Sequence, residues 1–445
     1  MNKPFGSLSS FLIVVSTVMK NHILIALFIA FTSFLSTAAT VASTTAAFQK
    51  IIDETSQNGG GIVRVGAGTH VIGSLFLKSN VTLFLEEGAV LKGSPDKRDY
   101  NPLNVCPQNR ASKAESATGA HLLLCIGQTN VAIRGSGKID GNCDAFLLDP
   151  NGIPWPGGES RIPWRTSQML YFVESSDLTV EGITLDNSPY WSCFFHGCKN
   201  GAVRNLRVRT RRVPYHAHNG DGIDIDCCED VEVSGCDINT ADDCIAIRAY
   251  QSPLLSPRPC ARIRVRDCKL SSACNAIRLG VGDGIIKDVH IRNIKVNDTR
   301  TAVDIVSSWR PGGRGVAFKN ILIDTMDVDS VLLCRISPNF AKETRIDGVT
   351  FANVTGKVEC SSWITGRPDS PIGKIVLDNV NLPHGVVCLN APDVRIVGGE
   401  FSLIESPSEE KQSMNRKIAE KNVFPCVFKG ELYRSIQSRR KKFAR

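Results

Sequence analysis

Three aspartates lie in two short segments that share one pattern of polar and apolar residues. Asp221 precedes the short β-like run at 222–225, and Asp242 and Asp243 precede a similar run at 244–247. The two segments start about one coil apart for a solenoid of short strands. Stacked strands are about 4.8 Å apart, so this spacing predicts that the three carboxyl groups share one open patch of surface. Crowded carboxylates push one pKa up and leave another group ionised, which sets an acid beside a base.

Further polar side chains are predicted on the same strip of the solenoid. When successive coils are overlaid, the third coil begins with Asn275. The outward positions of the overlaid coils carry charged residues, namely Asp224, Arg248, Arg278 and Asp304. An arginine can bind a carboxylate through two parallel hydrogen bonds, so this strip suits an acidic sugar chain.

Three other residues near the aspartates have two interpretations each. His218 comes just before Asp221 and could line the same groove, or it could be a solvent-facing turn residue. Tyr190 and Trp191 could stack on a sugar ring, or they could be buried aromatic residues of the sheet.

A repeating strand unit is expected to position these residues. Between residues 130 and 396 the chain repeats short runs that alternate apolar and polar residues, separated by Asn, Asp or Gly. The apolar period of two and the β-branched residues favour strands over helices. The sequence therefore predicts an all-β protein, a right-handed parallel β-helix with variable turns. A short helix after residue 44, ended by the glycines at 59–61, is expected to cap its first coil.

Two long loops interrupt the repeat. Residues 101–113 and 149–165 are rich in proline or aromatic residues, and the second loop contains Trp155, Arg161, Trp164 and Arg165. Long excursions from one side of a solenoid can form the wall of a groove, although plain variable loops would have the same composition.

The composition is that of an ordinary folded protein. Of the 445 residues, 42% are hydrophobic and 22% are charged, which argues against a disordered chain. A solenoid grows along one axis, so this length does not require several domains. The net charge of +8 suits a polyanionic partner, which could be an acidic polysaccharide, a nucleic acid or a membrane surface.

Sixteen cysteines are many for a protein of the reducing cytosol. Cys236 and Cys260 are spaced by about one coil, and so are Cys244 and Cys268. Each pair could form a disulfide, or the thiols could stack unpaired in the core. No two CxxC pairs with zinc-ligand spacing occur, and we therefore expect no metal site and no cofactor.

The N-terminal region has the three parts of a signal peptide. Lys20 is followed by an apolar run at 23–35 and by small residues at 36–47, and Met19 could be the true start. We expect a signal peptide over residues 1–43, with a membrane anchor as the alternative. A β-helix over 44–402 and a basic tail or cap over 403–445 would follow. Three glycosylation motifs, at Asn80, Asn297 and Asn353, agree with secretion to the extracellular space or cell wall.

The aspartate segments resemble two motifs of glycoside hydrolase family 28, the polygalacturonase family. Asn-Gly-Asp-Gly at 219–222 and Ala-Asp-Asp-Cys at 241–244 look like its Asn-Thr-Asp and Gly-Asp-Asp motifs. Residues 75–83, 88–91 and 180–191 look like other strands of that family, and the resemblance covers roughly residues 45–400. It implies a right-handed parallel β-helix that hydrolyses pectic backbones with inversion.

The resemblance also implies roles for individual residues. Asp242 would be the general acid that protonates the glycosidic oxygen, and Asp221 and Asp243 would be the bases that activate water. An inverting enzyme keeps acid and base about 6.5–9.5 Å apart to leave room for this water, and the reaction needs no metal. The expected substrate-binding residues are Asn219, Asn275, Arg278, Arg248 and His218. The expected partner is pectin, without nucleic acid or stable membrane association, and we expect a monomer.

Two positions depart from the family's pattern. Its Gly-His-Gly motif falls at 274–276, where Asn275 replaces the histidine, and its Arg-Ile-Lys motif falls at 304–306, where Asp304 replaces the arginine. Arg248 and Arg278 could take over the binding of a substrate carboxylate, or the subsite could hold a different sugar. A rhamnogalacturonan or other pectic glycosidase is therefore an alternative to a polygalacturonase. A catalytically inactive carbohydrate-binding β-helix and a calcium-dependent pectate lyase are alternatives of other classes.

Overall fold

The computed structural model describes residues 43–112, 115–149, 151–152, 162–210, 219–309, 314–342, 346–399 and 401–404. His218, Trp155 and Arg161 lie outside these residues, and so do the expected signal peptide, apart from residue 43, and the expected tail, apart from residues 403 and 404. Within the described part, no helix combines the length and the apolar character that crossing a bilayer requires.

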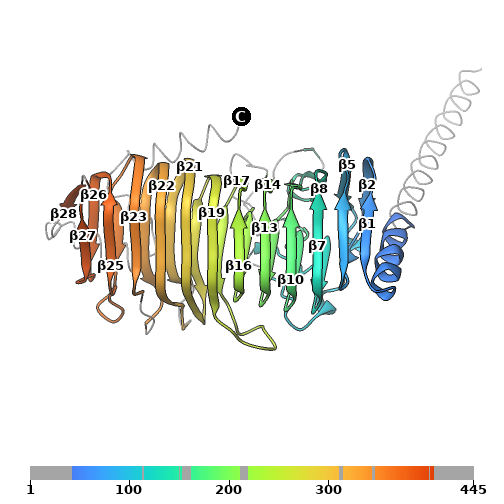
Figure 1. Ribbon diagram of the computed structural model, residues 1–445, viewed down its shortest axis with the longest axis horizontal. Coiled ribbons are helices and arrows are strands. Elements are labelled where there is room, and N and C mark those ends of the chain that lie inside the picture. Colours follow the sequence, from blue (N-terminus) through green and yellow to red (C-terminus); the bar gives the residue numbers. More distant parts are fainter. Residues whose placement is uncertain are drawn as a thin grey trace, which may run out of the picture.

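The chain winds into a long parallel β-helix, which confirms the predicted fold (Figure 1). Each strand pairs in parallel with the equivalent strand of the next coil, for example Ile223 with Ile245. The strands form three faces, here named A, B and C, and several long strands in the C-terminal half bend from one face to the next.

Face A is the face on which the three aspartates lie. It consists of β3 (Leu75–Phe76), β6 (Leu123–Ile126), β9 (Leu170–Val173), β12 (Cys193–His196), β15 (Ile223–Asp226), β18 (Ile245–Ala249), β20 (Asn275–Gly282), the ends of β21 (Ile285–Ser308) and β22 (Ala317–Asn339), β24 (Ser362–Thr365), β26 (Leu382–Leu389) and β28 (Phe401–Ile404).

Faces B and C complete each coil. Face B consists of β1 (Gly61–Val65), β4 (Val81–Leu85), β7 (Thr129–Gly135), β10 (Ser176–Glu181), β13 (Lys199–Arg204), β16 (Glu229–Ser234), the first parts of β19 (Cys260–Ser272), β21, β22 and β23 (Val349–Val358), then β25 (Ile375–Val380) and β27 (Val394–Val397). Face C consists of β2 (Gly68–Ile72), β5 (Ala89–Gly93), β8 (Lys138–Asp140), β11 (Thr184–Asp186), β14 (Arg207–Arg209), β17 (Asp237–Thr240) and the continuing parts of β19, β21, β22 and β23.

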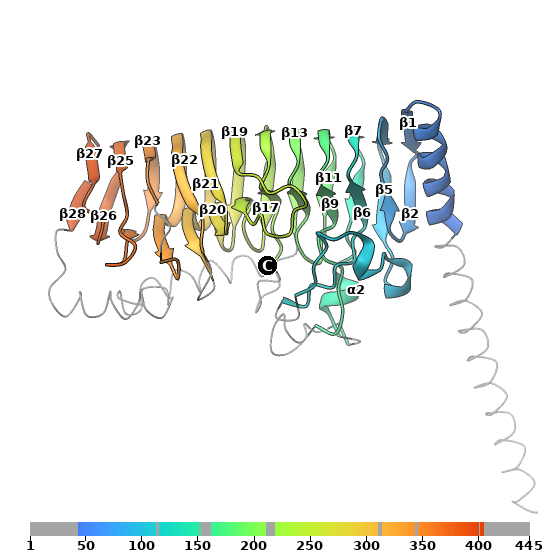
Figure 2. The same ribbon diagram turned by 90° about the horizontal axis from the view of Figure 1, so that it is seen from below.

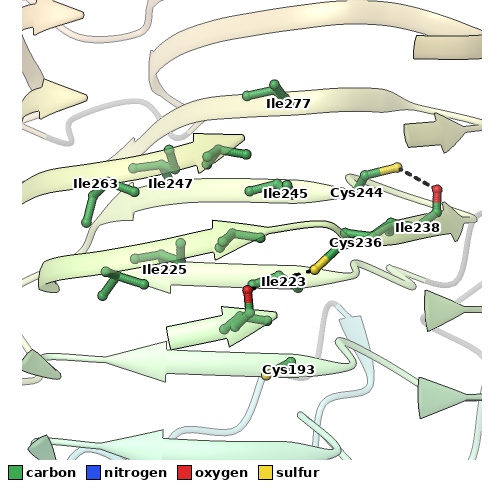
Figure 3. Close-up of a cluster of buried hydrophobic side chains, with 14 of the residues drawn as sticks. Cys193, Ile223, Ile225, Cys236, Ile238, Cys244, Ile245, Ile247, Ile263 and Ile277 are labelled. Atoms are coloured by element: carbon green, nitrogen blue, oxygen red, sulfur yellow. Dashed lines mark hydrogen bonds between the residues drawn. The ribbon is translucent and has the colours of Figure 1, made fainter. Parts of the chain in front are cut away.

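Stacked apolar side chains fill the interior. Cys193, Ile223, Ile245 and Ile277 are partners in successive strands of face A, and all four are fully buried. Figure 3 shows them in one column. Alternation along each strand sends every second side chain inward, so similar residues meet from coil to coil.

Asparagine and aspartate mark the bends because the backbone there is left-handed. Asn200, Asp230 and Asp288 have φ values of 54°, 58° and 54°, which these residue types tolerate better than most. Asn200 Nδ2 also donates a hydrogen bond to Asp177 Oδ1 of the preceding coil at 3.0 Å. The polar punctuation of the sequence repeat therefore has a conformational cause.

The cysteines of the described part form no disulfide, which agrees with the alternative of stacked thiols and contradicts the two disulfides. Cys236 faces Cys268 and not Cys260, because Asp237 pairs with Lys269 in the neighbouring coil. Cys260 instead belongs to a column with Cys228, whose thiol accepts a hydrogen bond from the backbone N–H of Cys198 at 3.3 Å.

A helix over residues 43–57 covers the first coil, as predicted (Figure 1). Its Ile52 is fully buried in the core, and Gln49 Nε2 donates a hydrogen bond to the backbone oxygen of Phe76 at 3.0 Å. The short helices η1 (Lys97–Asp99), η2 (Leu103–Val105) and α2 (Asp144–Leu147) lie in the loops that project beyond the strands of the N-terminal half (Figure 2). Trp164 packs there on Phe146, with ring centroids 5.2 Å apart.

The buried isoleucine column predicts how much a cavity within it lowers the free energy of unfolding. Ile245→Ala should lower the free energy of unfolding by about 2–5 kcal/mol, because the side chain is fully buried between two coils. Denaturant unfolding followed by circular dichroism measures the change. Ile62→Ala is the matched control, since Ile62 is 58% exposed and its loss should cost less than about 1 kcal/mol. Equal effects of the two substitutions would contradict the stacked core.

Candidate active site

Backbone hydrogen bonds between two coils bring the three aspartates together. Asp221 lies just before β15, and Asp242 and Asp243 lie in the turn between β17 and β18. The N–H of Gly222 donates to the backbone oxygen of Asp243 at 2.8 Å. A Cβ at position 222 would lie 2.4 Å from the backbone oxygen of Cys244, so only glycine allows the two segments to approach this closely.

The aspartates are more buried than the expected open patch. Asp221 and Asp243 are each 4% exposed, and only Asp242 keeps intermediate exposure. The expectation of an open surface was therefore wrong for two of the three. For Asp243 the reason is that Arg278 and Asn275 of the same strip cover its carboxyl group instead of pointing to solvent.

Asp243 is held by two of the residues predicted beside it. Arg278 donates through Nε to Asp243 Oδ2 and through Nη2 to Oδ1, the latter at 3.4 Å. Asn275 Nδ2 also donates to Asp243 Oδ1, at 2.6 Å. All three side chains are buried, so this carboxylate is fixed in position and its charge is matched by a guanidinium group.

Burial and mutual repulsion shift the pKa values of the other two aspartates. Burial raises the pKa of Asp221 well above its usual value, and the charges of Asp224 and Asp242 raise it further. Burial also raises the pKa of Asp242, with a further contribution from Asp243. A raised pKa lets a carboxyl group keep its proton to higher pH, and such a group that also retains some exposure can act as a proton donor.

The thiol of Cys274 adds a neighbour that the sequence did not suggest. It forms a hydrogen bond with the carboxyl group of Asp242 and accepts one from Arg300 Nη2 at 2.8 Å. Arg300 Nη2 also donates to Asn275 Oδ1 at 3.2 Å. These contacts link the side chain of Asp242 to the residues that hold Asp243.

Arg248 also lies on face A, and its positive charge is paired with two aspartates of the protein. Its guanidinium group lies 3.6 Å from Asp224 and 3.6 Å from Asp226, and its cation sits 4.3 Å from the centre of the Trp191 ring. Asp224 is fully buried, and neither of its oxygens has a hydrogen-bond partner. Burial raises the pKa of Asp224, while Arg248 opposes that shift.

A charge ladder continues beyond the aspartates. Asp304 pairs with Arg278 at 3.1 Å and with Arg335 at 2.7 Å, and Arg335 is the register partner of Asp304 in the next coil. Trp309, which is 36% exposed, lies over both guanidinium groups, 5.0 Å from Arg278 and 5.3 Å from Arg335. The overlay of sequence repeats ended at the coil that contains Asp304. Extending it by one coil would have placed Arg335 on the same strip.

Asn219 is held from the second long loop. Arg165 Nη2 donates to Asn219 Oδ1 at 3.3 Å, and the guanidinium group lies 4.8 Å from the centre of the Tyr190 ring. Tyr190 in turn donates to Glu115 Oε2 at 2.8 Å. Arg165 is fully buried and Tyr190 is 2% exposed, so these residues support the site from beneath and the buried interpretation of Tyr190 is the correct one.

Among the residues that the structure describes, two groups of side chains each offer three possible metal-binding atoms within 4.8 Å of one another. They are His196 with Asp226 and Cys227, and Asp242 with Asp243 and Cys274. In each group an arginine already faces a carboxylate, Arg248 in the first and Arg278 in the second. This paired positive charge weakens the attraction of a cation, so we assign a metal to neither group.

Comparison with known proteins places this site in a family context. The family model described as glycosyl hydrolases family 28 matches residues 107–395. A probable polygalacturonase of Vitis vinifera is 25% identical over 364 residues, which cover 76% of this chain and 70% of that protein. An endo-polygalacturonase of Pectobacterium parmentieri is 23% identical over 358 residues, which cover 76% of this chain and 84% of that protein.

Solved structures share the fold. An exopolygalacturonase from Thermotoga maritima superposes with a TM-score of 0.65 at 20% identity, over 80% of this chain and 88% of that one. A polygalacturonase from Erwinia carotovora superposes with a TM-score of 0.57 at 20% identity, over 81% of this chain and 93% of that one.

The raised pKa of Asp221 predicts a pH-dependent gain in stability when its charge is removed. An unfolded aspartate has a pKa of about 3.9. Because the folded-state pKa is higher, the folded protein binds more protons than the unfolded one between these values, and the free energy of unfolding falls as pH rises through this window. Asp221→Asn should therefore raise the free energy of unfolding by about 1–3 kcal/mol at pH 7, with the gain shrinking towards pH 4.

Denaturant unfolding at pH 4 and at pH 7 measures this gain. Asp378→Asn is the matched control, because Asp378 is exposed on β25 and its change should stay within about 0.5 kcal/mol at both pH values. An Asp221→Asn variant no more stable than the wild type at pH 7 would show that the carboxyl group is not crowded as described.

Proposed function

We propose that this chain, which belongs to family 28 of the glycosyl hydrolases, degrades pectic polysaccharide by a polygalacturonase-type hydrolysis with inversion. The family identifies a glycoside hydrolase. The named relatives from Vitis vinifera and Pectobacterium support the pectic substrate. The observation that carries the proposal is the partly exposed Asp242, with its raised pKa, beside the anchored carboxylate of Asp243.

Each aspartate has one role in the proposed reaction. Asp242 donates its proton to the glycosidic oxygen as the bond to the departing sugar breaks. Asp243, and Asp221 when it is ionised, accept the proton of a water molecule that attacks the anomeric carbon from the opposite side. The configuration at that carbon is thereby inverted. No metal takes part, because the acid, the base and the water supply every proton that moves.

The remaining side chains are proposed to bind the sugar chain or to hold the aspartates. Arg278 and Asn275 fix Asp243 in place, and Arg165 fixes Asn219. Arg248 lies on the same face and borders the substrate path through its contact with Trp191. His218, just before the first motif, stays a proposed binding residue.

The proposed setting of the enzyme is extracellular. A signal peptide over residues 1–43, a catalytic β-helix over 44–402 and a basic tail over 403–445 would deliver a secreted, glycosylated monomer to a wall or extracellular polysaccharide. The net charge of +8 would favour association with such a polyanion.

A rhamnogalacturonan or other pectic glycosidase is the second candidate function. It is favoured by one observation, namely that Asp304 occupies the strip and is paired with both Arg278 and Arg335. A guanidinium group that already binds a protein carboxylate is poorly placed to bind one from a substrate.

Removing the proposed acid should abolish most activity. Asp242→Asn is expected to lower kcat for reducing-sugar release from pectic polysaccharide by about 10²–10⁴-fold, since the amide cannot protonate the leaving oxygen. Asp378→Asn, an exposed substitution of the same kind, should leave kcat unchanged. Full activity of Asp242→Asn, or a wild type that binds the polysaccharide without cleaving it, would favour the inactive carbohydrate-binding alternative.

The stereochemistry of the product tests the proposed mechanism separately. We expect the first-formed reducing end to have the anomeric configuration opposite to that of the cleaved bond, because water attacks directly. Proton NMR of the reaction during the first minutes, before mutarotation mixes the anomers, measures this. Retention of configuration would contradict the assignment of Asp221 and Asp243 as bases.

A further inference from the structure

We infer that Cys274 is a positioning residue for the general acid: its thiol donates a hydrogen bond to Asp242 and leaves the carboxyl proton directed to the substrate. The inference rests on the proposed function, because it concerns the residue that would protonate the glycosidic oxygen. In the Gly-His-Gly motif that the sequence resembles, glycine stands at position 274, so the thiol is an addition of this chain.

The thiol lies at the edge of the aspartate cluster. Cys274 is in the bend that joins β19 to β20, and its sulfur lies within 4.8 Å of an oxygen of Asp242 and of an oxygen of Asp243. It forms a hydrogen bond with the carboxyl group of Asp242. Asp242 and Cys274 both have intermediate exposure, whereas Asp243 is buried. The hydrogen-bonded pair therefore consists of the two members of this group that retain access to solvent.

The surroundings of the sulfur determine which group donates this hydrogen bond. Burial raises the pKa of Cys274 well above its usual value, with the charge of Arg300 opposing this shift and that of Asp242 adding to it. The sulfur therefore keeps its proton. Arg300 Nη2 and Asn275 Nδ2 donate to the sulfur at 2.8 Å and 3.3 Å. Because these two donors use the acceptor positions of the sulfur, its S–H group is left to donate to Asp242.

Buried hydroxyl groups fix the backbone of both residues. Ser272 Oγ donates to the backbone oxygen of Asp242 at 2.5 Å and accepts a hydrogen bond from the N–H of Cys274 at 2.8 Å. Thr240 Oγ1 donates to the same oxygen of Asp242 at 2.7 Å. Ser272 and Thr240 are fully buried. The thiol and the carboxyl group are thus held beside each other before substrate binds, as preorganised catalytic groups must be.

A thiol donor acts on both protonation states of the acid. While Asp242 is protonated, the S–H group of Cys274 occupies one carboxyl oxygen, so the other oxygen carries the proton for the glycosidic oxygen. After proton transfer the same thiol donates to a carboxylate, and hydrogen bonds to a charged acceptor are the stronger ones. The contact therefore strengthens as the proton leaves, which is the condition for an interaction to raise kcat.

The charges around Asp242 set the sign of the expected effect on its pKa. The charged groups that face it are the carboxyl groups of Asp221, Asp224 and Asp243 and the guanidinium groups of Arg278 and Arg300. Burial and Asp243 raise the pKa of Asp242, whereas the thiol of Cys274 is among the contacts that lower it. Without the thiol this pKa should rise. Because a general acid must be protonated to act, activity should then persist to higher pH.

The pH dependence of kcat on pectic polysaccharide tests this role with two variants. Cys274→Ala should lower kcat about tenfold at its pH optimum, because a hydrogen bond to a charged group is lost, and should move the alkaline limb of kcat to higher pH. Cys274→Ser should restore both towards the wild type, because a hydroxyl group can donate in place of the thiol. Cys388→Ala is the matched control and should change neither, because Cys388 has the same intermediate exposure but lies on β26, several coils beyond the aspartates.

Two kinetic outcomes would overturn the inference. One is an alkaline limb of Cys274→Ala that stays at the wild-type pH, and the other is an equal loss of kcat in the alanine and serine variants, which would mark a packing role. The position of the limb does not depend on how much of a preparation is folded.

Carbon-13 NMR of the Asp242 carboxyl group separates the inference from the proposed function, because it needs no turnover. We expect Asp242 to titrate at higher pH in Cys274→Ala than in the wild type. An unchanged titration would overturn the inference and leave the proposed function in place. A wild type that cleaves no pectic polymer would instead overturn the proposed function, and the assignment of a positioning role with it.

Discussion

Backbone hydrogen bonds between neighbouring coils hold three carboxyl groups close together, although repulsion between their negative charges favours a larger separation. The N–H of Gly222 bonds to Asp243, and the missing side chain at position 222 permits this approach. Burial then raises the pKa values of Asp221 and Asp242. A flexible loop would relax such crowding by moving the groups apart. A parallel β-helix does not, because each strand is fixed by its neighbours on both sides over the whole length of the sheet.

Buried arginines stabilise this crowding of carboxyl groups. Arg278 links Asp243 to Asp304, and Arg335 continues the alternation of charge into the next coil. Each guanidinium group therefore orients carboxylates of the protein with little freedom.

Much of this arrangement could be predicted from the sequence, because residues of a solenoid that are one coil apart in the sequence lie side by side in the structure. The alternating apolar runs predicted the β-helix, and the same register predicted that Asp221 would lie next to Asp243. The burial of the two carboxyl groups could not be predicted in this way, since it depends on the direction of side chains such as Arg278 and Asn275, which cover Asp243. The expected partner of Cys236 was wrong because the turns between coils vary in length, and the actual register pairs it with Cys268.

The central claim is that Asp221 and Asp242 share a buried, crowded environment that raises the pKa of each carboxyl group above its usual value. Carbon-13 NMR of the aspartate carboxyl carbons, recorded between pH 3 and pH 9 with Asp221→Asn and Asp242→Asn for assignment, measures this directly. The account predicts two carboxyl signals that titrate above the usual aspartate value of about 3.9, each of which shifts when the other residue is replaced. Titration of both residues near 3.9, with no effect of one replacement on the other, would contradict it.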